Sequence, residues 1–113
     1  MSHEELRAGD APPAPTHGPG GLRVDLATRR AYAGPREIAL TKQLFDVLAY
    51  LLAHQGRVVP NSELVRAVWE HEVVGDRHFL QTVMYRLRVA RSAAQATDPI
   101  EVVRGVGYTI GRS

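Results

Sequence analysis

Apolar residues alternate with charged ones just after residue 21, and this pattern predicts β-strands. Leu22, Val24 and Leu26 occupy every second position, which is typical of a strand with one buried face. Polar turns separate this segment from two further short segments, residues 31–33 and 36–39. We expect the three segments to form a small antiparallel sheet.

After Thr41 the apolar residues recur at intervals of three and four, which predicts an amphipathic helix. The buried stripe would consist of Leu44, Val47, Leu48, Leu51 and Leu52. Thr41 can cap the first turn, and Gly56 lies just past the end of the pattern, where glycine commonly stops a helix. The first helix therefore lies between these two residues.

A second, shorter helix is expected over residues 61–70. Its apolar positions are Leu64, Val68 and Trp69. Asn61 or Ser62 can accept the free amide hydrogens of the first turn.

A third helix follows a loop over residues 71–75, with Asp76 as its cap. Its inner stripe would be Leu80, Met84 or Val83, Leu87 and Ala94. The opposite face would carry Gln81, Thr82, Tyr85, Arg86 and Arg88. Residues 97–99 should end this helix, because proline disfavours helix at the position before it.

The last segment predicts a β-hairpin, with strands at residues 100–103 and 108–110 around the turn 104–107. At the other end, residues 9–21 are rich in proline and glycine and offer almost nothing to bury, which is typical of a solvated linker. We therefore expect a linker or tail over residues 1–21 and one folded domain over residues 22–113.

Composition limits the classes of protein that need considering. The chain has 113 residues, 44% of them hydrophobic, which suits one domain with a modest core. It has no cysteine, no apolar run long enough to span a bilayer and no signal peptide, so we expect a soluble cytoplasmic protein. The five histidines show no metal-ligand spacing and no nucleophile motif is present, so we expect neither a cofactor nor an enzyme.

The net charge is only +2, but it is unevenly distributed. Residues 77–113 hold six arginines against two carboxylates, a net charge of +4, whereas residues 57–76 carry −2. A basic C-terminal third is suited to a polyanionic partner.

The third helix has the size and side chains to enter the major groove of DNA. Arg86 could pair with guanine, Gln81 with adenine, and Thr82 could contact a thymine methyl, while Tyr85 and Arg88 could hold phosphates. Arg104 at the hairpin tip could reach a minor groove. The simpler interpretation is a solvated helix face and an ordinary surface arginine on a turn.

The chain resembles the OmpR/PhoB family of response-regulator effector domains over nearly all of residues 22–113. The residues that carry the resemblance are Ile38 to Thr41 with Leu44 and Phe45, Gly56 to Val59, Leu64 with Val68 and Trp69, Arg86 to Arg88, and Val103 to Tyr108. Their order and spacing together are specific.

The resemblance implies an α+β winged helix-turn-helix with a four-stranded antiparallel N-terminal sheet, three helices and a C-terminal hairpin wing. It implies double-stranded DNA as the partner, with the third helix in the major groove and the wing at the minor groove. By position, Arg86 would read bases, Arg104 would be the wing contact and Trp69 would pack in the core. The positions that face the DNA backbone would be those of His78, Val83, Tyr85 and Arg88.

Four positions depart from the family's frequent residues. Val83 replaces a histidine, Tyr85 an arginine, Gln81 an acidic residue, and Pro60 a serine that caps the second helix. The less basic helix face leaves an alternative open, a winged-helix module that binds proteins and has no specific DNA binding.

Two further partners are implied by the resemblance. RNA polymerase would meet the loop between the second and third helices, here Glu72, Val73, Val74, Gly75 and Asp76, although a plain solvated loop fits equally well. A second copy of the domain would bind alongside the first in a tandem homodimer on DNA. The receiver domain that usually precedes this fold in a two-component system has no room in the 113 residues, so we expect either an effector fragment with residues 1–21 as its linker or a stand-alone regulator. The proline-rich stretch favours the fragment.

Overall fold

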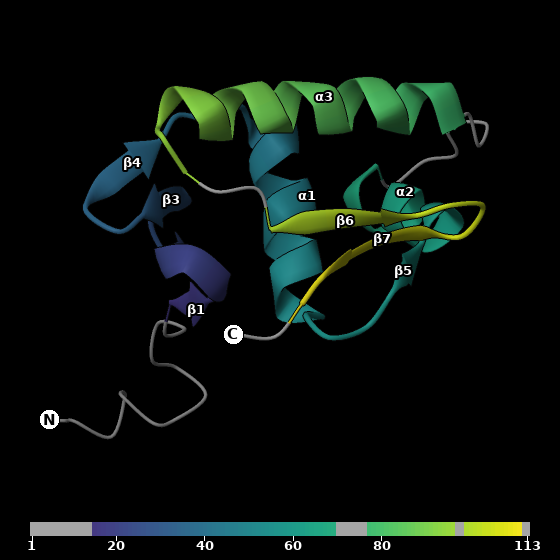
Figure 1. Ribbon diagram of the computed structural model, residues 1–113, viewed down its shortest axis with the longest axis horizontal. Coiled ribbons are helices and arrows are strands. Elements are labelled where there is room, and N and C mark those ends of the chain that lie inside the picture. Colours follow the sequence, from purple (N-terminus) through teal and green to yellow (C-terminus); the bar gives the residue numbers. More distant parts are fainter. Residues whose placement is uncertain (1–14, 70–76, 97–98, 112–113) are drawn as a thin grey trace, which may run out of the picture.

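The computed structural model describes residues 15–69, 77–96 and 99–111, and the backbone alone for residues 77–79. Within these residues the helices and strands follow one another along the chain as in Figure 1. They are β1 (Thr16–His17), the 3-10 turn η2 (Pro19–Gly21), β2 (Leu22–Asp25), β3 (Arg30–Ala33), β4 (Arg36–Ile38), α1 (Lys42–Ala53), β5 (Val59–Pro60), α2 (Asn61–Val68), α3 (Arg77–Ala93), β6 (Ile100–Val103) and β7 (Gly107–Ile110).

Strands β1 to β4 form an antiparallel sheet in the order β1-β2-β3-β4, which confirms the predicted N-terminal sheet. Leu22, Val24, Ala31 and Ile38 point into the core and are buried. The predicted linker is wrong in its last part, since β1 pairs with β2 through Thr16 and Val24. Two consecutive glycines with positive φ angles turn the chain between these strands, so a segment that buries little is still held by backbone hydrogen bonds.

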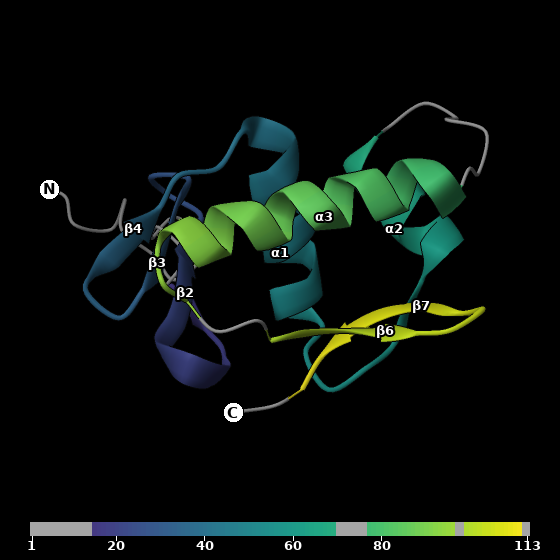
Figure 2. The same cartoon turned by 45° about the horizontal axis from the view of Figure 1, so that its top comes forward.

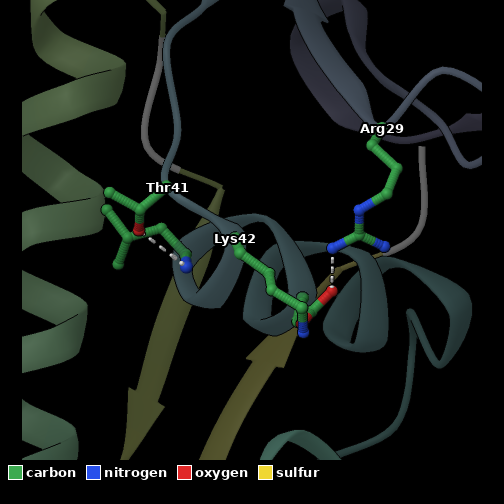
Figure 3. A network of polar contacts seen from close by, with 5 residues as sticks. Arg29, Thr41 and Lys42 are labelled. Carbon is green, nitrogen blue, oxygen red and sulfur yellow. Dashed lines mark hydrogen bonds and ion pairs between the residues drawn. The ribbon is translucent and has the colours of Figure 1, made fainter.

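Helix α1 begins where the sequence predicts, because the Thr41 hydroxyl accepts a hydrogen bond from the Leu44 amide at 3.3 Å. Figure 3 shows this cap beside a second contact, in which Arg29 from the β2–β3 turn reaches Asp46 on α1. Lys42 holds the other carboxylate oxygen of Asp46 at 3.1 Å. The sheet and the central helix are thus joined by both polar and apolar contacts.

The core lies around α1, which passes behind α3 and between the N-terminal sheet and the C-terminal hairpin (Figure 1). The five predicted apolar positions of α1 are all buried, together with Phe45. The second and third helices and the C-terminal sheet add Leu64, Leu80, Leu87, Val59 and Ile110, each at most 1% exposed. Among the described residues, no helix is long and apolar enough to cross a membrane.

Helix α2 begins at Asn61 but is not capped by a side chain, so the predicted Asn61 or Ser62 cap is wrong. Pro60 occupies the cap position and has no side-chain acceptor to offer. The backbone amide of Asn61 instead donates to the carbonyl of Val106 in the turn between β6 and β7, at 3.0 Å. The turn between β6 and β7 therefore caps the second helix.

Helix α3 ends at Ala93, four residues before the predicted break. Gln95 adopts a left-handed conformation, φ 59°, and the amides of Gln95 and Ala96 donate back to the carbonyls of Ser92 and Arg91 at 2.9 Å each. This is a Schellman-type end, which stops the helix before Pro99 can.

The C-terminal hairpin is part of a sheet with the order β5-β7-β6, of which the sequence predicted only the two hairpin strands. Strand β5 pairs with β7 through Val59 and Tyr108 and through Pro60 and Gly107. A Cβ atom on Gly107 would overlap the carbonyl oxygen of Val59, so only glycine permits this close pairing.

Candidate nucleic-acid interface

The outward face of α3 carries two lines of side chains at helical spacing. Gln81, Tyr85 and Arg88 lie on the side toward the hairpin, because all three line the groove between α3 and β6. Thr82, Arg86 and Val89 form the neighbouring line and are exposed. Both predicted arginines are therefore on the surface, but two residues of separation place them on opposite flanks of the face.

Val83 does not lie on this face. Its side chain is 5% exposed and packs in the core with Leu80 and Leu87, so the prediction that Val83 faces DNA is wrong. Positions 80, 83 and 87 follow the three- and four-residue spacing of one buried stripe, and an apolar valine completes it. The side chain of His78, another predicted contact, lies outside the described residues.

Arg91 is one of the six arginines that make the C-terminal third basic, but the structure buries it to 2% exposure. It lies four residues after Leu87 and extends the buried stripe of α3, while also lining the groove toward β6. The helical spacing from Leu87 indicates a buried position for Arg91, whereas its charge favours an exposed one. The exposed positive charge of the C-terminal third is correspondingly smaller than the sequence count.

The wing, which we define as β6, β7 and the turn between them, presents Arg104 at its exposed tip. The turn is closed by a hydrogen bond from the Val106 amide to the Val103 carbonyl at 2.9 Å, and Gly105 has φ 79°. Val102 and Val106 are also exposed, at 68% and 47%. The tip and the adjoining end of β6 therefore combine one cation with two apolar side chains.

In both views α3 and the wing lie on the same side of the molecule (Figures 1 and 2). Two adjoining open grooves lie between them. The first has a volume of about 210 Å³ and contains Tyr85 and Arg88. The second, of about 310 Å³, contains Asn61 and Arg104. Gln81, Val102 and Tyr108 line both, so helix face and wing border one continuous depression.

Polar contacts hold α2 against α1. Arg57 donates two hydrogen bonds to Glu63, at 3.1 and 2.7 Å, and the Tyr50 hydroxyl donates to the same carboxylate. These bonds lower the pKa of Glu63 to about 2, so its carboxylate is charged at neutral pH. At the far end of α2 the Trp69 side chain is buried at 7% exposure, which confirms its predicted place in the core.

Two residues of this depression, Asn61 and Val102, are not indicated by the sequence pattern, which favours a helix cap at Asn61 and a strand position at Val102. The proposed polymerase-contact loop, Glu72 to Asp76, lies outside the described residues.

The chain is similar in sequence to known transcriptional regulatory proteins. The family model described as "Transcriptional regulatory protein, C terminal" matches residues 35–110. The phosphate regulon transcriptional regulatory protein PhoB of Rhizobium meliloti is 33% identical over 91 residues, which are 80% of this chain and 40% of PhoB. The chain thus spans less than half the length of such curated relatives.

Solved structures show the same fold. The RstA DNA-binding domain of Klebsiella pneumoniae, determined in complex with the RstA box, superposes with a TM-score of 0.71 at 26% identity, over 81% of this chain and 92% of that domain. The response regulator DrrB, an OmpR/PhoB homologue from Thermotoga maritima, has a TM-score of 0.69 at 27% identity, over 84% of this chain and 43% of DrrB.

These relatives are transcription regulators, as the winged-helix arrangement of α3 and the hairpin led us to expect, and not enzymes. The chain belongs to the OmpR/PhoB-type family of C-terminal domains of transcriptional regulatory proteins.

Proposed function

We propose that this chain binds double-stranded DNA with sequence preference and regulates transcription as the effector domain of a response regulator. In this proposal α3 enters the major groove and the wing contacts the adjacent minor groove. The observation that carries it is the shared depression, in which Gln81 on α3 and Arg104 at the wing tip line one groove, while Tyr85 and Arg88 line the adjoining one. A cytoplasmic location accompanies this function.

The comparisons support the proposal. The RstA domain was solved on its DNA box, and RstA aligns over four fifths of this chain. An input signal and a receiver domain belong to the same proposal, because the chain spans 40% of the R. meliloti PhoB length.

Roles of the individual side chains follow from their place on α3. Arg86 is exposed and has the fork geometry for bidentate pairing with guanine. Gln81 and Thr82 are exposed one turn earlier and are suited to adenine and to a thymine methyl. Tyr85 and Arg88, toward the wing, are suited to the phosphates between the two grooves.

Three parts of the proposal rest on the family resemblance alone. His78 would contact the DNA backbone, RNA polymerase would meet residues 72–76, and two copies would bind in tandem. The alternative, a protein-interaction module, is favoured by the exposed apolar residues Tyr85 and Val102 beside the groove, at 65% and 68% exposure.

Selection of bound duplexes from a random library, followed by titration of the best site at 50 and 200 mM salt, tests the proposal. We expect enrichment of a repeated motif. We also expect affinity to fall with salt, with a logarithmic slope of about −0.9 for each phosphate contacted. No enrichment, together with a flat salt response, would favour the protein-interaction module.

A further inference from the structure

The orientation of the wing relative to α3 is set through other elements of the fold. Helix α3 chiefly contacts α1, α2 and β4, whereas β7 chiefly contacts β5, β6 and α1. Open grooves lie between α3 and the wing. A DNA reader that uses both elements gains affinity when their mutual orientation is fixed before binding, because less freedom is then lost on the duplex. The contacts that join β7 to the helices are therefore important for binding.

The segment of residues 56–61 holds β7 along its length. At the end of the strand, the Gly56 amide donates to the Ile110 carbonyl at 2.7 Å. Next to it, the Thr109 hydroxyl donates to the Arg57 carbonyl at 2.8 Å. Closer to the wing turn, β5 pairs with β7 through backbone hydrogen bonds. The position of the wing thus depends on where this segment lies.

Arg57 joins the same segment to the helices. Its guanidinium donates two hydrogen bonds to Glu63 on α2, at 3.1 and 2.7 Å, and Tyr50 on α1 donates to the same carboxylate. A bidentate pair fixes the direction of the guanidinium as well as its distance. Because α1 and α2 also pack against α3, Arg57 connects the wing to the helices that support the predicted reading helix.

We propose that Arg57 is a positioning residue, whose carbonyl bonded to Thr109 and guanidinium bonded to Glu63 set the angle of the wing relative to α3. This angle brings Arg104 to the minor groove. The inference rests on the proposed function and adds the residues that align its two DNA-contacting elements. The described residues that line the two grooves include neither Arg57 nor Glu63 nor Thr109, so these three would act on DNA binding through the wing.

Glu63→Gln separates positioning from a direct phosphate contact of Arg57, whose side chain is 48% exposed. The variant removes a negative charge and weakens the hold on Arg57, so a direct contact would bind the duplex more tightly. Lost positioning instead lowers the affinity, by about three- to tenfold for one or two weakened hydrogen bonds. Glu37→Gln removes the same charge from β4 and is the control, which should bind within about twofold of the wild type. Unchanged or tighter binding of Glu63→Gln relative to this control would overturn the proposal.

A pair of substitutions at Thr109 tests the other side of the connection. Thr109→Val keeps the shape of the side chain and removes the donor to Arg57, whereas Thr109→Ser keeps the donor. On the selected duplex, Thr109→Val should bind about threefold or more weakly, and Thr109→Ser should bind as the wild type does. In an Arg104→Ala background, Thr109→Val should have no further effect, because the contact that it misplaces is already missing. Equal losses with and without Arg104 would indicate a general structural role and overturn the proposal.

Residual dipolar couplings of the free protein measure the orientation of the wing without DNA. We expect the amide couplings of β6 and β7 to change relative to those of α3 in Thr109→Val and to stay as in the wild type in Thr109→Ser. Couplings that are the same in all three proteins would overturn the positioning role. Wild-type protein that selects no duplex would instead refute the proposed function, while the couplings would still report whether Thr109 and Arg57 align the wing.

Discussion

Gly107→Ala is the substitution whose effect the geometry determines most directly. A Cβ at position 107 would overlap the Val59 carbonyl oxygen and lie 2.9 Å from the Pro60 Cα. Both neighbours are backbone atoms and cannot rotate away. Strands β5 and β7 must therefore separate by roughly 1 Å or more before ordinary van der Waals contact returns.

The cost follows from the hydrogen bonds at that place. Separation breaks the Asn61–Val106 bond of 3.0 Å and weakens the short β5–β7 ladder. At about 1 kcal/mol for each bond, the loss is about 2–3 kcal/mol, or a melting temperature lower by about 10–20 °C.

Urea unfolding followed by circular dichroism measures this loss. Gly111→Ala is the matched control, since a Cβ at that position meets nothing within 4 Å, and its stability should stay within about 0.5 kcal/mol of the wild type. If Gly107→Ala were as stable as the control, the close approach of β5 and β7 would not contribute to stability as we describe.

Three further outcomes are expected. Arg86→Ala should weaken binding to the selected duplex by about 1–3 kcal/mol and relax one base preference. Arg36→Ala, which removes the same charge from β4, should do neither. An unchanged base preference in Arg86→Ala would exclude Arg86 as a base reader. Thr41→Ala removes the cap of α1 and should lower stability by about 1 kcal/mol in urea unfolding, so an equally stable variant would count against the cap. Because the Glu63 pKa is lowered from 4.5 to about 2, the charged Glu63 carboxylate stabilises the fold above pH 4.5, and this stabilisation is lost as the pH falls toward 2. The corresponding part of the acid transition should disappear in melting curves of Glu63→Gln. Melting curves that depend on pH in the same way in Glu63→Gln and in the wild type would contradict this prediction.

The elements that could be predicted are those whose signal is local. Helix α1 combines a long apolar stripe with a capping threonine, and it begins where expected. The glycine turn and alternating residues of the wing likewise fix its two strands within one residue. Each of these features is determined by residues close together in sequence.

The features that escaped prediction depend on contacts distant in sequence. The two-residue strands β1 and β5 are too short to show periodicity, and each exists because a longer strand offers it hydrogen bonds. The partner of the Asn61 amide lies 45 residues further along the chain, so a local search for caps could not find it.

Within the candidate site, the exposed residues of α3 were predicted better than the boundary of its buried face. Val83 and Met84 are consecutive, and helical spacing alone could not decide which of them points inward. Packing against α1 and α2 decides it, with Val83 at 5% exposure and Met84 half-buried. Arg91 shows the same limit, because its burial follows from position and not from polarity.

The N-terminal sheet touches α3 at β4, at the end of the helix away from the wing turn (Figure 1). A helix of 17 residues behaves as a rod about 25 Å long, so a small shift where one end is held becomes a change of angle along its whole length. The sheet, together with α1 and α2, which also contact α3, thereby holds the tilt of this helix. On the proposed function, substitutions in β4 would consequently change which DNA sequences are preferred, by re-aiming side chains of α3 that are themselves unaltered.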